Sequence, residues 1–485
     1  MTKEVQTGMI EEDRYRRQKL IWGDEGQAKL DNAKVAVIGL GPQGIYSALC
    51  MAALGIGNIV LVDGNNSDVG EMFLDMDVPQ GARGDVYPEL LRRINAQIGI
   101  QGYATNLESS IDQLALSGAN VIVDATNNQR SKRLALAFGR EKDIPVLSTS
   151  SRWGYTKLML GSEGKEPEML MPMFEGHEQD PLMALVMAGI VTEKVKKLAF
   201  GSLDEVIRDP IRYRLGGKRF GFPDVDEEIP LPNYDLYRAL NILFLGEGAL
   251  GNWATIAMSH LRPGRVDKVD YDIFESHNIN RQVLAYDGID AEKAAHLAEK
   301  LRRMTKGATE SEGFNVKILP GFSLEREYDY VFDLVDNFYT RAVNSAFAVN
   351  NHIPLVSAGA GAHGGRWDVH VEGETQCMGC MFDIYERGRE EEIIRRVSCA
   401  ANPNPAVVMS NAIAGVAAVL ELFSLVEPEK YGGAFNGEQT YRAVGKVRLG
   451  TSPSRGACDC YSNEAPSLEI SEAEVAAYTE AGGEK

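Results

Sequence analysis

An internal repeat constrains the fold of this chain more than any other feature of its sequence. The glycine pattern Gly-x-Gly-x-x-Gly begins at Gly39 and again at Gly246, each time after a short apolar run and before a helical stretch. The next apolar run ends in an acid, at Asp63 in the first case and at Asp270 in the second. Both features recur with a shift of 207 residues. The chain therefore contains two copies of one α/β unit, named below the first and the second repeat.

Each repeat has the pattern of a strand, a tight glycine turn, a helix and a strand, and further alternating strands and helices follow. This alternation predicts an α/β fold of two tandem Rossmann-like domains with mostly parallel sheets. We expect the first domain at residues 1–230 and the second at residues 236–460, separated by a proline- and acid-rich linker near residues 222–235. Residues 461–485 are acidic and are expected to form a loosely held tail or a short helix.

Charge and composition argue against several classes of partner. The chain has 485 residues, a formal net charge of −19 and a pI of about 5.0. We do not expect so acidic a chain to bind nucleic acid or an anionic membrane. No stretch reaches the roughly 20 uninterrupted apolar residues of a membrane-spanning helix. Residues 1–18 are polar and charged, unlike a signal peptide. We therefore expect a cytoplasmic protein.

The two repeats differ in polar residues that follow the glycine turn. Four aligned pairs, with the second repeat given first, are Asn278 and Glu71, Arg281 and Leu74, Lys293 and Val86, and Asp336 and Asn127. The first three pairs use the shift of 207 residues, and the last uses a shift of 209 residues that aligns the later segments. The second repeat alone has cations that can neutralise phosphates together with acids that can hold a ribose and Mg²⁺. We infer one working nucleotide site, in the second repeat, and one degenerate partner.

At this point the second repeat resembles the ThiF/MoeB/E1 superfamily, whose members adenylate the C-terminus of ubiquitin-like proteins. The family signature is met by the glycine turn, the sequence DYDIFESHNINRQ at residues 270–282, Lys293, and Asp336-Asn337 with Arg341. One departure is His277, where the family usually has Ser. The arrangement is similar to that of eukaryotic E1 enzymes, which pair an inactive with an active adenylation domain. Here both domains lie in one chain as a pseudo-dimer. The sequence leaves open whether two such chains form a homodimer.

The resemblance implies a role for each residue of the site. ATP would lie across the glycine turn, with Asp270 on its ribose and with Asn278, Arg281 and Lys293 on its phosphates. Asp336, with the second acid of the DYD sequence, would hold Mg²⁺. The residues expected to bind these cofactors are Gly246, Gly248, Gly251, Asp270, Asp272, Asn278, Arg281, Lys293, Asp336 and Asn337.

An arginine of the first repeat is implied to complete the site. In the superfamily an arginine of the partner domain reaches the nucleotide, and the matching residue is Arg17, in the basic sequence RYRRQ at residues 14–18. A solvated basic helix face is the plainer alternative. Catalysis of this kind rests on positioning and on neutralising charge. The implied catalytic groups are Arg17, Arg281, Lys293, Asp336 and, for a later step, Cys399.

Four cysteines of the second repeat form two close pairs, Cys377 with Cys380 and Cys458 with Cys460. Four thiolates in two pairs suit a tetrahedral Zn²⁺ ion, and the superfamily commonly has a zinc site at these places. The second pair is Cys-x-Cys, which is one residue tighter than the usual Cys-x-x-Cys. Reduced cysteines without a metal are the alternative.

A fifth cysteine, Cys399, stands apart in a charged crossover segment at residues 381–405, beside Arg395 and Arg396. Neighbouring cations favour the thiolate form of a cysteine. In E1 enzymes a cysteine of this stretch accepts the adenylated C-terminus as a thioester, and the sequence SCAANPNP looks most like the compact E1 of the ubiquitin-fold modifier. ThiF and MoeB proteins also have a cysteine near this position, with a different or dispensable role, and a buried structural cysteine is the plainest alternative.

Two functions follow from the resemblance. The first is an E1-like enzyme that adenylates a ubiquitin-like (β-grasp) protein, forms a thioester on Cys399 and transfers the modifier to an E2-like partner. No C-terminal ubiquitin-like domain is evident for docking an E2. The alternative is adenylation of a sulfur-carrier protein or a peptide without transfer to an E2. The sequence does not say which carboxylate is activated.

Overall fold

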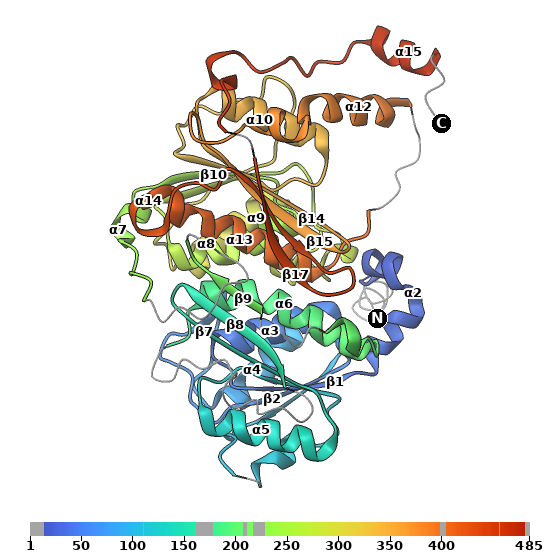
Figure 1. Cartoon of the computed structure of the whole chain (residues 1–485), viewed down its shortest axis with the longest axis vertical. Helices are drawn as coiled ribbons and strands as arrows, with labels where there is room; N and C mark the ends of the chain where they lie inside the picture. Colours follow the sequence, from blue (N-terminus) through green and yellow to red (C-terminus); the bar gives the residue numbers. More distant parts are fainter. Residues whose placement is uncertain are drawn as a thin grey trace.

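Two α/β units lie end to end, with a layer of helices between their sheets (Figure 1). The computed structural model describes residues 14–109, 111–161, 178–206, 211–216, 228–397, 404–454 and 456–480. The expected fold class, two α/β repeats with mostly parallel sheets, is confirmed.

The first sheet has seven strands in the order β5-β2-β1-β6-β7-β8-β9. The strands from β5 to β7 in this order are parallel to one another, whereas β7 with β8 and β8 with β9 pair antiparallel. The strands are β1 (Lys34–Ile38), β2 (Asn58–Val62), β5 (Gly99–Tyr103), β6 (Val121–Asp124), β7 (Val146–Arg152), β8 (Tyr155–Gly161) and β9 (Ile211–Arg214). A separate hairpin is formed by β3 (Met72–Phe73) and β4 (Met76–Asp77).

The second sheet repeats this order and adds one strand, giving β12-β11-β10-β13-β14-β15-β16-β17. Its register repeats as well, because Val35 pairs with Ile59 in the first sheet and Ile242 pairs with Val266 in the second. The strands are β10 (Asn241–Leu245), β11 (Arg265–Val269), β12 (Gly313–Phe314), β13 (Tyr330–Asp333), β14 (Leu355–Gly361), β15 (Gly364–His370), β16 (Gly437–Arg442) and β17 (Arg448–Pro453).

Helices follow the strands in both repeats. In the first repeat they are α2 (Arg16–Asp31), α3 (Pro42–Leu54), α4 (Arg83–Ile94), α5 (Gln129–Lys142) and α6 (Pro181–Ala199). In the second repeat they are α7 (Tyr234–Arg238), α8 (Ala249–Leu261), α9 (Lys293–Met304), α10 (Phe338–Asn350), α11 (Met378–Phe382), α12 (Ile384–Val397), α13 (Val408–Val426), α14 (Pro428–Tyr431) and α15 (Glu472–Glu480).

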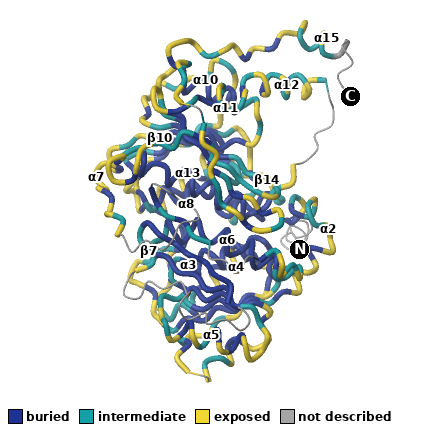
Figure 2. Tube along the Cα trace, in the orientation of Figure 1, coloured by how far each residue is buried: buried dark blue, intermediate teal, exposed yellow. Residues whose placement is uncertain are grey.

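The core between the repeats consists of α3, α6, α8 and α13, which are buried along almost their whole length (Figure 2). Glycines allow these helices to pack closely. A Cβ atom at Gly189 of α6 would lie 2.7 Å from the Ile413 side chain of α13, and one at Gly415 would lie 2.8 Å from the Leu250 carbonyl of α8. The apolar faces of both glycine-turn helices thus join one continuous core.

Helix α13 has the length and composition of a membrane-spanning helix, with 19 residues and a mean hydropathy of 1.7. In this structure 94% of its apolar window is buried inside the protein, against α6, α8 and the strands β14 and β15. Burial in the core accounts for its composition, because a helix that is apolar all round must be covered on every side.

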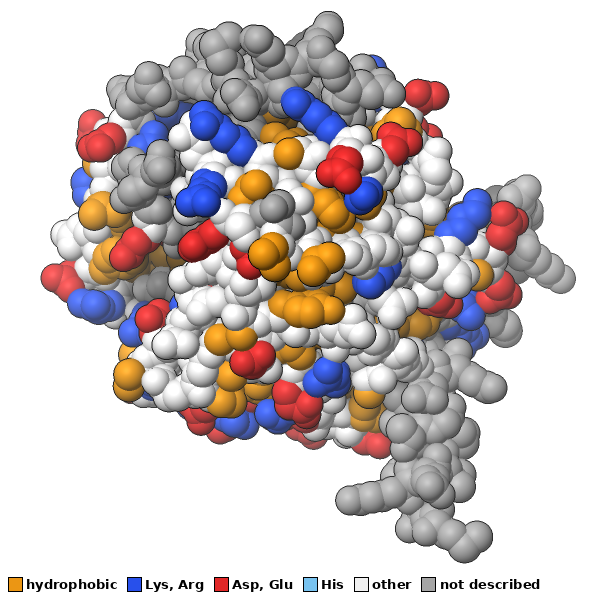
Figure 3. All heavy atoms as spheres, turned by 90° about the horizontal axis from the view of Figure 1, so that it is seen from below, with side chains coloured by type: hydrophobic (Ala, Val, Ile, Leu, Met, Phe, Trp, Pro, Cys, Tyr) orange, Lys and Arg blue, Asp and Glu red, His pale blue; other side chains and the backbone are white. Residues whose placement is uncertain are grey.

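Polar contacts also join the repeats. Asp75, which is buried in the β3–β4 hairpin, accepts hydrogen bonds from Lys300 Nζ (2.9 Å) and from the Tyr286 hydroxyl (2.9 Å). The face at the end of the first repeat has interspersed acidic, basic and apolar side chains, and its described residues form no continuous basic surface in this view (Figure 3).

The acidic C-terminal segment is held against the second repeat over its described part. Arg389 of α12 donates hydrogen bonds to the carbonyl oxygens of Ser467 and Glu469, and it pairs with Glu474 of α15. Arg396 of α12 donates to the carbonyl of Ile470. Helix α15 therefore lies beside α12, the helix of the expected crossover segment (Figure 1).

Candidate functional site

The glycine turn of the second repeat connects β10 to α8. Gly246 has φ = 100°, a conformation that suits glycine. A Cβ at Gly251 would lie 2.6 Å from the Gly246 carbonyl oxygen, so the helix can start this close to the turn only with glycine there. No atom lies within 4 Å of a Cβ built at Gly248, the N-cap of α8. There is thus open space beside the N-terminus of α8, where backbone N–H groups could bind a phosphate.

Asp270 lies next to the turn, at the carboxyl end of β11. Its carboxylate accepts hydrogen bonds from the Glu247 N–H (2.7 Å) and the Asp272 N–H (2.9 Å). Burial raises the pKa of Asp270, and nearby Lys293 opposes that rise. A carboxylate can accept about four hydrogen bonds, so Asp270 keeps acceptor capacity that suits a ribose hydroxyl.

Two arginines from different repeats, Arg17 and Arg281, lie near each other, because the charge of one acts on the other and both contact His277. Arg281 is buried in the segment after β11, and burial, together with the nearby charge of Arg17, lowers its pKa to about 10, whereas Asp336 opposes this shift. The Arg281 guanidinium donates to the His277 carbonyl (2.7 Å) and to Asn280 Oδ1 (2.9 Å). No carboxylate in the described parts of the chain forms an ion pair with Arg17 or Arg281. Such a pair of cations suits an anionic ligand.

Arg17 belongs to α2 of the first repeat yet contacts the second repeat. Its guanidinium donates to the Asn404 carbonyl (3.1 Å) and lies 3.5 Å from His277 Nε2. Its neighbour Arg14 is buried and donates to the carbonyl oxygens of Ile94 (2.7 Å) and Ile279 (3.4 Å). The start of α2 is therefore anchored across the junction of the repeats, which places Arg17 at the candidate site.

Lys293 and Asn278 have partners of their own in this structure. Lys293, the first residue of α9, forms an ion pair with Asp272 (3.0 Å). The Asn278 side chain accepts from the Glu275 N–H (3.0 Å) in a reciprocal capping arrangement that closes a short 3₁₀ turn. Asn278 thus holds the loop that carries Arg281, and Lys293 is neutralised beside Asp270 before any ligand binds.

Asp336 and Asn337 follow β13 and complete the edge of the site. Asp336 is exposed, whereas the Asn337 side chain caps α10 by accepting from the Thr340 N–H (2.8 Å). Arg341 is buried beneath them, where it pairs with Asp333 and donates to Ser357 Oγ (2.7 Å). In this motif Asp336 is free to face a cation, while Arg341 stabilises the end of the strand.

Sequence reasoning missed a buried ion pair beneath the glycine turn. Glu247, inside the turn, lies 3.3 Å from Lys268 of β11, and Lys268 also donates to Thr255 Oγ1 (2.7 Å). Both charged side chains are fully buried, and burial raises the pKa of Glu247 to about 7. The alignment of the repeats could have revealed this pair. The residues of the first repeat that align with Glu247, Lys268 and Thr255 are Leu40, Leu61 and Ala48, which are all apolar.

The first repeat has filled the corresponding place with its own side chains. Glu71, aligned with Asn278, forms an ion pair with Arg83 (3.0 Å) and accepts from the Tyr87 hydroxyl (2.5 Å). Leu74, aligned with Arg281, is buried in the apolar core. The polar groups that could hold phosphates in the second repeat thus have no equivalent among these residues of the first.

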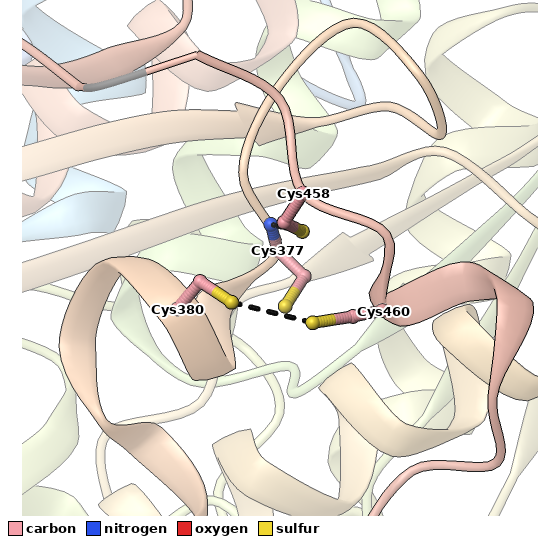
Figure 4. A group of neighbouring side chains, drawn as sticks. All are labelled: Cys377, Cys380, Cys458 and Cys460. Carbon is pink, nitrogen blue, oxygen red and sulfur yellow. Dashed lines mark hydrogen bonds between the residues drawn. The ribbon is translucent and has the colours of Figure 1, made fainter.

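The two cysteine pairs of the second repeat converge at one point (Figure 4). The sulfur atoms of Cys377, Cys380, Cys458 and Cys460 all lie within 4.8 Å of one another. The Sγ atoms of Cys380 and Cys460 are 3.2 Å apart, and the Cys377 N–H donates to Cys458 Sγ (3.1 Å). Zinc–sulfur bonds of about 2.3 Å place sulfurs roughly 3.8 Å apart in a tetrahedron. The cluster therefore fits a metal ion, in spite of the tighter second pair.

Cys399 lies outside the described residues. The described chain reaches Val397 at the end of α12 and resumes at Asn404, whose carbonyl binds Arg17. The expected role of Cys399 stays a prediction.

Residues 15–197 and 225–446 each match the model of the ThiF family. Among curated proteins, the chain is 32% identical over 146 residues to the adenylyltransferase and sulfurtransferase MOCS3 of Bos taurus, a match that covers 30% of this chain and 32% of that protein. It is 28% identical over 166 residues to the tRNA threonylcarbamoyladenosine dehydratase of Escherichia coli K12, with coverage of 34% and 59%. The chain thus spans less than two thirds of either relative.

A crystal structure of E. coli MccB with AMPCPP and selenomethionine MccA has 18% sequence identity and a TM-score of 0.40, and the match covers 47% of this chain and 67% of that one. A likeness at this level supports no conclusion about function. The two matches to the ThiF family model are independent of this structural likeness, and they cover both repeats and most of the chain. On that ground the protein belongs to the ThiF family.

Proposed function

We propose that this protein uses ATP and Mg²⁺ to adenylate the C-terminal carboxylate of a small carrier protein or peptide. The observation that carries the proposal is that Arg17 of the first repeat and Arg281 of the second lie close enough for the charge of Arg17 to lower the pKa of Arg281, on which the charge of Asp336 also acts. A relative that matches part of the chain is named an adenylyltransferase.

The geometry suits a phosphoryl substitution without a protein nucleophile. A carboxylate oxygen of the substrate attacks the α-phosphorus of ATP, the bond to the bridging oxygen of pyrophosphate breaks, and an acyl adenylate remains. Asp270 binds the ribose, while Arg281, Arg17 and Lys293 neutralise charge on the phosphates. Asp336 and Asp272 would hold Mg²⁺, which neutralises the leaving pyrophosphate. Lys293 must then exchange its contact with Asp272 for a phosphate oxygen.

The cysteine cluster would hold Zn²⁺ in a structural role, because all four ligands are supplied by the protein and no open position is left for a substrate. Cys377 and Cys380 flank the start of α11, and Cys458 and Cys460 lie far along the chain. A metal there ties the segment before α12 to the C-terminal segment.

A second candidate is E1-like transfer, in which the adenylated carboxylate belongs to a ubiquitin-like protein and passes to Cys399 as a thioester. What favours it is that the charge of Arg395, in the last turn of α12, acts on Tyr271 next to Asp270, and that Arg17 binds the carbonyl of Asn404, which follows Cys399 in the chain. An E2-like partner would then receive the modifier.

Exchange of radiolabelled pyrophosphate into ATP tests the adenylation directly. Candidate substrates are sulfur-carrier proteins, ubiquitin-like proteins and peptides with a free C-terminus. We expect exchange with one of these classes, its loss in Asp336→Ala and its persistence in Asn127→Ala, the matched change in the first repeat. Exchange that survives Asp336→Ala would contradict the assignment of the site.

The same reaction separates the two candidates. An adduct between substrate and protein that survives SDS, is cleaved by DTT and is absent in Cys399→Ala supports E1-like transfer. Full exchange activity in Cys399→Ala without any such adduct supports adenylation alone.

A further inference from the structure

We propose that the first repeat binds a nucleoside that carries no phosphate, in a hollow that its degenerate site has kept. A cavity of about 200 Å³ lies where β1, β2 and β6 end, and its walls include Gly39 of the glycine turn and Asp63 at the end of β2. The aligned residues in the second repeat, Gly246 and Asp270, form the candidate nucleotide site.

The acid of this cavity has the same contacts as its counterpart. Asp63 accepts from the Leu40 N–H (2.7 Å) and the Asn65 N–H (2.8 Å). Asp270 accepts from two backbone N–H groups at the aligned positions, at 2.7 Å and 2.9 Å. Two backbone contacts leave a carboxylate with acceptor capacity on the cavity side. Asp63 is therefore oriented for a ribose hydroxyl just as Asp270 is.

The phosphate end of the degenerate site is closed by a side chain of the same repeat. The Gln43 N–H, in the first turn of α3, donates to Gln179 Oε1 (3.0 Å), and Gln179 Nε2 donates to the Ala125 carbonyl (2.6 Å). A Cβ built at Gly41 would lie only 2.7 Å from that Oε1 atom. The amide oxygen thus occupies the place at the helix N-terminus where a phosphate oxygen would bind.

The charges around the cavity also disfavour a phosphate. Two carboxylates, Asp63 and Glu108, line the cavity, and its lining residues include no Lys or Arg. The remaining walls are apolar or neutral. The face of a base could pack against the apolar side chains of the wall, and its edge could bind the amide groups. The apolar residues are Ile38, Val62 and Leu107, and the amides are Asn65, Asn106 and Asn128. A neutral nucleoside brings no negative charge next to these two carboxylates, whereas they would repel a phosphate.

Binding of labelled adenosine in the presence of saturating ATP tests the proposal, because ATP fills the site of the second repeat and is excluded from the first. Equilibrium dialysis of the full chain should show close to one adenosine per chain that ATP does not displace. AMP should compete for this site at least tenfold more weakly than adenosine. Complete displacement of adenosine by ATP would overturn the proposal.

Variants locate the site. Asp63→Asn should abolish the ATP-resistant adenosine, and Asn65→Trp, at an exposed position of the cavity wall, should do the same by filling the space. Asn66→Trp, at the adjacent exposed position outside the wall, is the matched control and should bind normally. Retention of the ATP-resistant adenosine in Asn65→Trp would also overturn the proposal. Pyrophosphate exchange should be unchanged in Asn65→Trp, so this result does not depend on whether adenylation is found.

Discussion

Arg17 and Arg281 come from different repeats, yet the charge of Arg17 contributes to lowering the pKa of Arg281. Like charges repel, and burial of Arg281 strengthens that repulsion. The structure maintains the arrangement through neutral contacts, since Arg17 donates to the Asn404 carbonyl and Arg281 donates to the His277 carbonyl. Two guanidinium groups near each other in this way favour binding of a polyanion, and the candidate site then depends on residues from both repeats.

Removing the guanidinium of Arg17 should therefore impair the reaction more than the fold. We expect Arg17→Ala to lower the rate of pyrophosphate exchange by about 10²–10³-fold, the usual effect of losing one donor that stabilises transition-state charge. Arg17→Lys should recover only part of the rate, because lysine lacks the planar fork of donors. Arg16→Ala, at the exposed neighbouring position, is the control. A rate for Arg17→Ala within twofold of this control would contradict the role.

The buried pair of Glu247 and Lys268 leads to a prediction about stability. Lys268→Leu should lower the free energy of unfolding by about 3–5 kcal/mol, because it leaves Glu247 buried without its partner. Glu247→Leu with Lys268→Leu should recover most of that loss, because leucines stand at both aligned positions of the first repeat. Urea denaturation measures both variants. If the double variant is no more stable than Lys268→Leu, the pair does not act as a unit.

The glycine turns and the acids after them could be predicted because they depend on local sequence. A tight turn needs glycine at Gly246 and Gly251. After the helix that follows the turn, the next strand must end where the sequence becomes polar, at Asp270. The two-repeat fold followed from the same local pattern found twice. The cysteine cluster was also predictable, because close spacing within each pair limits how its sulfur atoms can be placed.

Contacts between distant segments could not be predicted in the same way. The sequence does not reveal that Gln179 closes the turn at Gly41, because 137 residues intervene between them and no motif marks the amide. Asn278 was expected to hold phosphate, yet its oxygen caps a turn in this structure. The choice between such roles depends on which backbone donors the tertiary fold leaves nearby.

The cysteine cluster should bind one metal ion per chain. We expect metal analysis of the purified protein to find about one equivalent of zinc, and we expect Cys458→Ser and Cys377→Ser each to lose it with a lower melting temperature. Cys50→Ala, which changes a buried cysteine in α3 far from the cluster, should keep the metal. Retention of a full equivalent of zinc in both cluster variants would rule out this site.

His260 should make the stability of the protein depend on pH. It lies on α8 at the junction of the repeats, where its Nε2 is 2.7 Å from the Tyr46 hydroxyl of α3. Burial, followed by the nearby charge of Arg262, lowers its pKa to about 4 from the ordinary histidine value of 6.5. Between these values the unfolded chain binds a proton that the folded protein does not, so the stability contributed by neutral His260 is present above pH 6.5 and is lost as the pH falls toward 4.

The expected loss over that range is about 3 kcal/mol, since each pKa unit corresponds to about 1.4 kcal/mol. Other buried groups titrate in the same range, and Glu247 acts in the opposite direction because its pKa is raised. The difference between the wild type and His260→Gln isolates the histidine, because both proteins share those groups. Urea denaturation at pH 7 and at pH 5 should show a smaller loss of stability for His260→Gln. His352→Gln, at an exposed position, should lose as much as the wild type. Equal losses in all three proteins would mean that His260 is protonated inside the folded protein.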